Sequence, residues 1–143
     1  MSILHGVFMR KLKVLILSLS FFAGCAISNE NQNSQEIDYS EADLDLIAAL
    51  VERGSDANKE HLVSYTVDCS TEAQVKGILA GAIKQGFEDD YVSYSEKNKV
   101  WSTSLTRYLK LNLSEISSNR AKIIPLMPAQ GCKSLGWGAS VVM

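Results

Sequence analysis

Between residues 60 and 142, segments with strand periodicity and segments with helix periodicity follow one another in an order that few folds accommodate. Strands are predicted at 61–69, 87–94, 100–109 and 133–142, and helices after Ser70 and after Leu111. This βαββαβ order is the split arrangement of ferredoxin-like folds. We therefore expect an α+β fold, a ferredoxin-like two-layer α/β sandwich in which the helices cover one face of a four-stranded antiparallel sheet.

A further helix is predicted ahead of this unit, giving the order α-βαββαβ. Ser40-Glu41-Ala42-Asp43 has the pattern of a capping box, which marks a helix start. Apolar residues then recur at helical spacing, namely Leu44, Ile47, Ala48 and Val51. Gly54 follows as a residue that ends helices. The pattern predicts an amphipathic helix whose apolar side is formed by these residues.

The two later helices carry clear start and stop signals. Thr71-Glu72-Ala73-Gln74 is a second capping pattern, and Gly86 closes the helix that follows it. Asn112-Leu113-Ser114-Glu115 begins the last helix. Pro125 lies inside the apolar pattern of that helix, where a proline removes a hydrogen bond and clashes with the preceding turn. We expect a kink or an early stop near Ile124.

The N-terminus has the pattern of an export signal. Arg10, Lys11 and Lys13 precede an apolar run at 14–23, too short to span a bilayer, which needs roughly twenty residues. The run ends in Phe22-Ala23-Gly24-Cys25, which resembles the lipobox of bacterial lipoproteins. The resemblance implies that residues 1–24 are a signal peptide and that Cys25 is acylated. The alternative is an uncleaved apolar anchor in which Cys25 is a buried thiol.

The lipobox resemblance also implies a location and a domain division. Ala26 follows the cysteine where an Asp would retain the protein in the inner membrane, so the periplasmic face of the outer membrane is favoured. Residues 25–40, with scattered Asn, Gln and Ser, read as the acylated cysteine and a flexible tether. Residues 41–143 form the predicted domain. We expect this domain to be attached to the membrane through the lipid on Cys25.

Charge argues against nucleic acid as a partner. The whole chain has a net charge of -2, with 14 basic and 16 acidic residues. Removal of the signal takes Arg10, Lys11 and Lys13 with it, which leaves 11 basic residues and a net charge near -5. Nucleic-acid binding needs a basic surface that displaces counterions from phosphates.

Cys69 and Cys132 are the cysteines that remain once Cys25 is acylated. The envelope is oxidising, so an even pair there suggests a disulfide. In a ferredoxin-like sheet the first and last strands are antiparallel neighbours. Cys69 ends the first predicted strand and Cys132 begins the last, so the two meet at one edge of the sheet. The alternative is a pair of buried thiols.

Three short motifs resemble the family of regulators of ribonuclease E activity B (RraB). They are Gly54-Ser55-Asp56 after the first helix, Gly86-Phe87 after the second, and Gly136-Trp137-Gly138 in the last strand. The similarity covers roughly residues 41–143. It implies a small acidic ferredoxin-like protein that inhibits ribonuclease E by protein contact and is not an enzyme. Leu135 stands where the family usually has an Asp.

The resemblance and the signal imply different compartments, because ribonuclease E works in the cytoplasm. We therefore expect a membrane-anchored lipoprotein whose non-catalytic, RraB-like domain binds another, unknown protein. One alternative is an envelope lipoprotein that binds or senses a small ligand, in a pocket lined by Tyr91, Tyr94, Trp101 and Tyr108. A second is a genuine ribonuclease E regulator, which requires an inactive signal.

Two groups of residues are candidate interaction sites. Gly136, Trp137 and Gly138 could give a partner access to the indole, or Trp137 could fill the core while the glycines make room for it or form a bulge. Glu88, Asp89 and Asp90 could present a negative surface to a basic partner, or could simply be solvated.

Metal, cofactor and catalytic sites are not predicted. His61 is the one histidine after the signal, and without clustered cysteines or acids a solvated or packed role is expected for it. The sequence has no phosphate-binding glycine loop and no Gly-x-Ser-x-Gly motif.

Overall fold

A computed structural model of the chain describes residues 37–143, except for the side chains of Asp90 and Ser134. The predicted signal peptide, Cys25 and most of the predicted tether lie outside this part. The described residues form a four-stranded antiparallel sheet with the strand order β2-β3-β1-β4. The strands are β1 (Glu60–Cys69), β2 (Glu88–Ser95), β3 (Val100–Lys110) and β4 (Cys132–Ala139). This order confirms the predicted ferredoxin-like fold.

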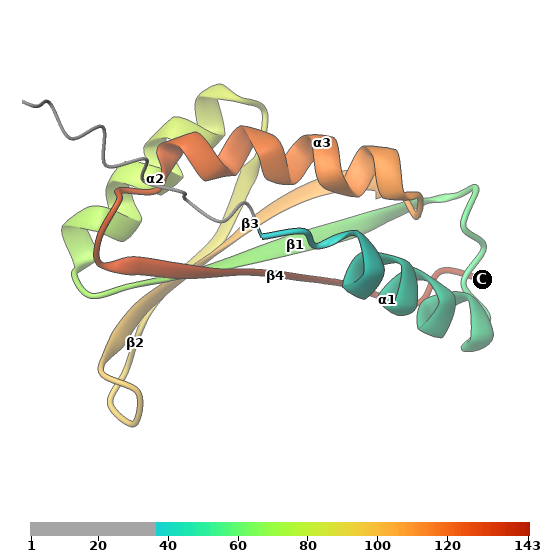
Figure 1. The fold of residues 1–143 in the computed structure, drawn as a ribbon, viewed down its shortest axis with the longest axis horizontal. Helices are drawn as coiled ribbons and strands as arrows, with labels where there is room; N and C mark the ends of the chain where they lie inside the picture. Colours follow the sequence, from blue (N-terminus) through green and yellow to red (C-terminus); the bar gives the residue numbers. More distant parts are fainter. Residues whose placement is uncertain (1–36) are drawn as a thin grey trace, which may run out of the picture. The chain divides into compact units, whose positions relative to one another are not determined.

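Helices α2 (Glu72–Lys84) and α3 (Leu113–Ile123) lie together on one side of the sheet (Figure 1). Both begin as the capping motifs predict. Thr71 and Gln74 form a reciprocal capping box, and the Asn112 side chain accepts a hydrogen bond from the Glu115 backbone. The stop at Pro125 is also confirmed, because α3 ends at Ile123 and continues only as the 3-10 turn η1 (Ile124–Leu126).

The core lies between the sheet and these two helices. Alternate residues of β1 point toward the helices and are fully or almost fully buried, namely His61, Val63, Tyr65, Val67 and Cys69. The Tyr65 hydroxyl donates a hydrogen bond to the carbonyl of Ile116 in α3, at 2.8 Å. Burial raises the pKa of Tyr65, so the hydroxyl stays protonated and keeps this bond.

Helix α1 (Ser40–Glu52) starts differently from the prediction. Tyr39 is its N-cap residue and makes no side-chain capping bond, while the Ser40 hydroxyl donates back to Asp38. Asp43, predicted as the last residue of the capping box, is only 2% exposed. The buried side of α1 is therefore centred on Asp43 and Leu50. The predicted apolar face is wrong in part, because Leu44 and Val51 are left exposed.

Both outer strands of the sheet carry a bulge. In β2, residues 90 and 91 lie opposite Ser104, and in β4, residues 134 and 135 lie opposite Val67. A bulge interrupts the row of backbone groups to which another strand would pair. Bulges on edge strands disfavour recognition by strand addition, which leaves the face of the sheet as the surface that a partner can approach.

Candidate interaction face of the sheet

The face of the sheet opposite α2 and α3 is lined by small residues. Two rows of side chains cross it in register: Gly138, Ser64, Thr106 and Glu88, then Gly136, Thr66 and Ser104. We call these seven residues the open face, within which Ser104 and Thr106 are almost fully buried. Strand pairing thus brings the glycines of the Gly-Trp-Gly motif and Glu88 of the acidic run, distant in sequence, onto one surface.

The two glycines of the open face are not crowded by other parts of the domain. A Cβ atom added at Gly136 or Gly138 would meet nothing within 4 Å beyond the adjoining residues, and neither glycine has a positive φ. The bulge at residues 134 and 135 immediately precedes Gly136. A glycine inside a strand weakens it, and its usual role is a bulge, a bend or the close approach of another molecule. Because Gly136 and Gly138 have no side chain, nothing projects from the sheet at these positions, and another backbone can approach closely there.

Three of the four hydroxyl groups of the open face form hydrogen bonds within the sheet. Ser64 and Ser104 share a hydrogen bond, and the Thr106 hydroxyl donates to the carbonyl of Glu88 at 3.2 Å. The open face therefore offers a partner a flat surface with few free hydrogen-bonding groups. At one end of it, Leu62 and Tyr108 lie opposite each other on β1 and β3 and are 41% and 60% exposed. They supply apolar area next to the flat floor.

The acidic run does not form a single negative surface. Glu88 pairs with Thr106, whereas Asp89 pairs with Leu105, and these two positions of β3 point to opposite faces of the sheet. The side chain of Asp90 lies outside the described part of the structure. Glu88 alone is placed on the open face, at the end of the row that begins at Gly138.

Trp137 belongs to the other face, is half-buried, and is part of a cluster around the buried Asp43 and Arg120. Its indole Nε1 donates to Asp43 Oδ1 at 2.8 Å. Arg120 of α3 donates to both carboxylate oxygens of Asp43, at 2.5 and 2.6 Å, and its guanidinium lies 4.2 Å from the centre of the Tyr39 ring. We call Tyr39, Asp43, Arg120 and Trp137 the α1 clamp. Because the indole nitrogen is engaged there, Trp137 fastens α1 and is not an exposed binding group.

The α1 clamp was not predicted from the sequence. Asp43 and Arg120 are 77 positions apart, and each fits an ordinary role on a helix surface. Their burial, with exposed fractions of 2% and 3%, depends on how α1 packs against α3. The one available signal was the family motif, since a buried tryptophan on the last strand needs an acceptor for its N–H group.

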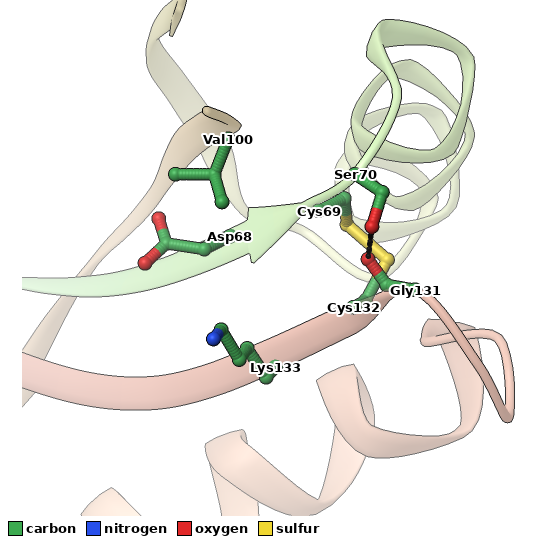
Figure 2. Close-up of a pocket in the computed structure, with 7 residues that line it drawn as sticks. All are labelled: Asp68, Cys69, Ser70, Val100, Gly131, Cys132 and Lys133. Atoms are coloured by element: carbon green, nitrogen blue, oxygen red, sulfur yellow. Dashed lines mark hydrogen bonds between the residues drawn. A yellow bond between two sulfur atoms is a disulfide. The ribbon is translucent and has the colours of Figure 1, made fainter. Parts of the chain in front are cut away.

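Cys69 and Cys132 form a disulfide between the end of β1 and the start of β4 (Figure 2). A small recess beside it is lined by Asp68, Cys69, Ser70, Val100, Gly131, Cys132 and Lys133. Figure 2 shows Asp68 and Lys133 on neighbouring strands, and Ser70 bonded to the Gly131 carbonyl. None of the four aromatic residues of the ligand hypothesis lines this recess.

The aromatic residues do not converge on a common site. Tyr94 and Trp101 stack on each other near the tip of the β2–β3 hairpin, with ring centres 5.2 Å apart. Tyr108 is near the opposite end of β3, and Tyr91 is in the β2 bulge. The ligand pocket predicted from these side chains is therefore not formed by the described residues.

His61 has a packed role. It is fully buried, and its Nδ1 donates to the carbonyl of Lys59 at 2.9 Å. Within residues 37–143 no group of three or more His, Cys, Asp or Glu side chains is arranged to hold a metal ion. Across the same residues, no helix has the length and apolar character needed to cross a membrane.

Comparison with known proteins agrees with the motifs. The family model described as regulator of ribonuclease activity B matches residues 40–139, which include α1, the whole sheet and both helices that cover it. No curated protein sequence matches the chain.

Proposed function

Because this chain belongs to the family of regulators of ribonuclease activity B, we propose that it is a non-catalytic protein-interaction domain whose partner packs on the open face. The observation that carries the proposal is the pair Gly136 and Gly138. They weaken an edge strand, neither has a positive φ, and a Cβ atom at either position would meet nothing within 4 Å beyond the adjoining residues. The close approach of a protein partner to the face gives a role to both glycines.

We further propose that the domain works in the cell envelope, anchored through an acylated Cys25. Two independent features support this location. One is the signal-like segment that ends at Cys25. The other is the disulfide between Cys69 and Cys132, since such bonds persist in oxidising compartments and are rare in the cytosol. The partner is then an envelope protein, and ribonuclease E, on the other side of the inner membrane, is not.

The anchor predicts a specific labelling pattern. Cells that express the full chain and are fed a palmitate analogue are expected to yield a labelled protein that fractionates with membranes. The Cys25→Ser variant is expected to be unlabelled and to leave the membrane fraction. The Cys69→Ala/Cys132→Ala variant is the control, and it should retain the label. Co-purification of the wild-type protein with ribonuclease E from intact cells, with Cys25 unmodified, would overturn the proposed location.

Open-face variants test the binding surface. Gly136→Gln and Gly138→Gln place a long side chain on the floor of the face without a clash, so stability should be kept while crosslinking to the partner in intact cells falls by roughly tenfold. Gly77→Gln is the matched control. Gly77 is an exposed glycine on α2, and a Cβ there also meets nothing within 4 Å. Equal crosslinking of all three variants and the wild type would rule out the open face.

A further inference from the structure

Helix α1 exposes an apolar stripe that the domain does not cover. Leu44, Ala48 and Val51 recur three and four residues apart, so they share one side of the helix. Leu44 is 51% exposed and Val51 is 44% exposed. The buried side, centred on Asp43 and Leu50, lies next to this stripe and packs toward α3 and β4.

Exposed apolar side chains also occur at both ends of the described chain. Just before α1, Ile37 is 65% exposed, and at the C-terminus Met143 is 86% exposed. The C-terminal residues are fixed beside the end of α1 (Figure 1), because the Asp56 backbone donates to the Val142 carbonyl and Lys59 Nζ donates to that of Met143. The exposed large apolar side chains at this end of the domain are Ile37, Leu44, Val51, Val141 and Met143.

The length of chain between the anchor and α1 points to what covers the stripe. Residues 26–36 separate Cys25 from Ile37, and the fully extended chain between these two residues spans no more than about 40 Å. A short link of this kind keeps α1 at a high effective concentration near the surface to which the chain is attached. An apolar helix face held near that surface is close to the bilayer, and burial of its apolar side chains in the bilayer interface is favourable.

We propose that the α1 stripe rests on the lipid bilayer in which Cys25 is anchored, so that the domain is held on the membrane at two points. This inference rests on the proposed lipid anchor. The acidic residues of α1 further specify the lipid. Glu41, Asp45 and Glu52 lie within one sector of the helix, next to the stripe. Negative side chains there disfavour anionic headgroups, so the surface that fits is zwitterionic.

Depth-dependent fluorescence quenching tests this contact. The acylated full chain, carrying Leu44→Trp, is reconstituted into vesicles of phosphatidylethanolamine and brominated phosphatidylcholine. The matched control is Ile83→Trp, because Ile83 on α2 is 50% exposed, against 51% for Leu44. After subtraction of the wild-type signal, Leu44→Trp is expected to be quenched at least roughly twofold more than Ile83→Trp. Replacing part of the zwitterionic lipid by phosphatidylglycerol is expected to reduce that difference.

Each other result contradicts the inference. Equal quenching of the two tryptophans, or none, means that the stripe does not rest on lipid. The Leu44→Trp tryptophan can also be shielded from water and yet not be quenched by brominated lipid. If the particle mass in detergent is then doubled, the stripe packs against a second copy of the chain instead. Mass spectrometry of the same sample tests the anchor separately. An acylated protein that floats with vesicles but shows no quenching overturns the bilayer contact and leaves the proposed anchor standing.

Discussion

Replacing Asp43 with alanine is expected to lower the free energy of unfolding by about 3–5 kcal/mol, the usual cost of removing one partner from a buried ion pair. The carboxylate accepts from Arg120 twice and from the Trp137 indole once. Its loss leaves a guanidinium that is 3% exposed without its counter-charge, in a site where Arg120 Nε already has no hydrogen-bond partner. Urea unfolding followed by circular dichroism measures the effect.

Two further variants make the measurement specific to the α1 clamp. Asp45→Ala removes an exposed carboxylate from the same helix and is expected to change the free energy of unfolding by no more than about 0.5 kcal/mol. Asp43→Ala/Arg120→Met removes both charges, so it should cost less than Asp43→Ala alone, because no charge is then buried without a partner. An Asp43→Ala protein as stable as Asp45→Ala would show that the pair is not buried in solution.

Removing the disulfide is the other change with a large expected effect. Cys69 and Cys132 are 63 residues apart, and the chain-entropy model gives about 4 kcal/mol for a crosslink that closes a loop of this length. The Cys69→Ala/Cys132→Ala variant is therefore expected to have a free energy of unfolding lower by about that amount. Its urea unfolding midpoint should fall accordingly. Alanine is chosen because Cys69 is 1% exposed, where a serine hydroxyl would add a burial cost of its own.

A reducing agent separates the crosslink from the side chains. Dithiothreitol should destabilise the wild-type protein by about the same amount and should leave the double alanine variant unchanged. A thiol assay on the unfolded, unreduced, acylated protein should find no free thiol. Two titratable thiols in that assay, or wild-type stability that is insensitive to reduction, would mean that the bond is absent from the mature protein.

The fold could be predicted because its signals are local. Short stretches of sequence carry each of them: the turn glycines, the Thr71 capping box, Pro125 and the periodicity that marks each strand. The cysteine pair then followed from strand order, since β1 and β4 are neighbours. The alternation of side chains along β2 could also have shown that Glu88 and Asp89 face opposite ways.

The orientation of α1 could not be predicted in the same way. Its apolar residues occupy more than one side of the helix, so periodicity alone does not select which side is buried. The choice is made by Asp43, which turns inward to reach Arg120 and Trp137. Nothing local to residues 40–52 signals that a carboxylate is the most buried group of the helix, because its partners come from α3 and β4.

The position of the α1 clamp has a mechanical consequence. Tyr39 is the last residue before α1, and its ring stacks on Arg120. In a chain tethered through Cys25, a pull on the N-terminal segment reaches Tyr39 and Asp43 before it reaches any strand. The load is then transferred through Arg120 to α3 and through Trp137 to β4. In a chain anchored in this way, the α1 clamp takes up a pull on the N-terminal segment before the hydrogen bonds of the sheet do.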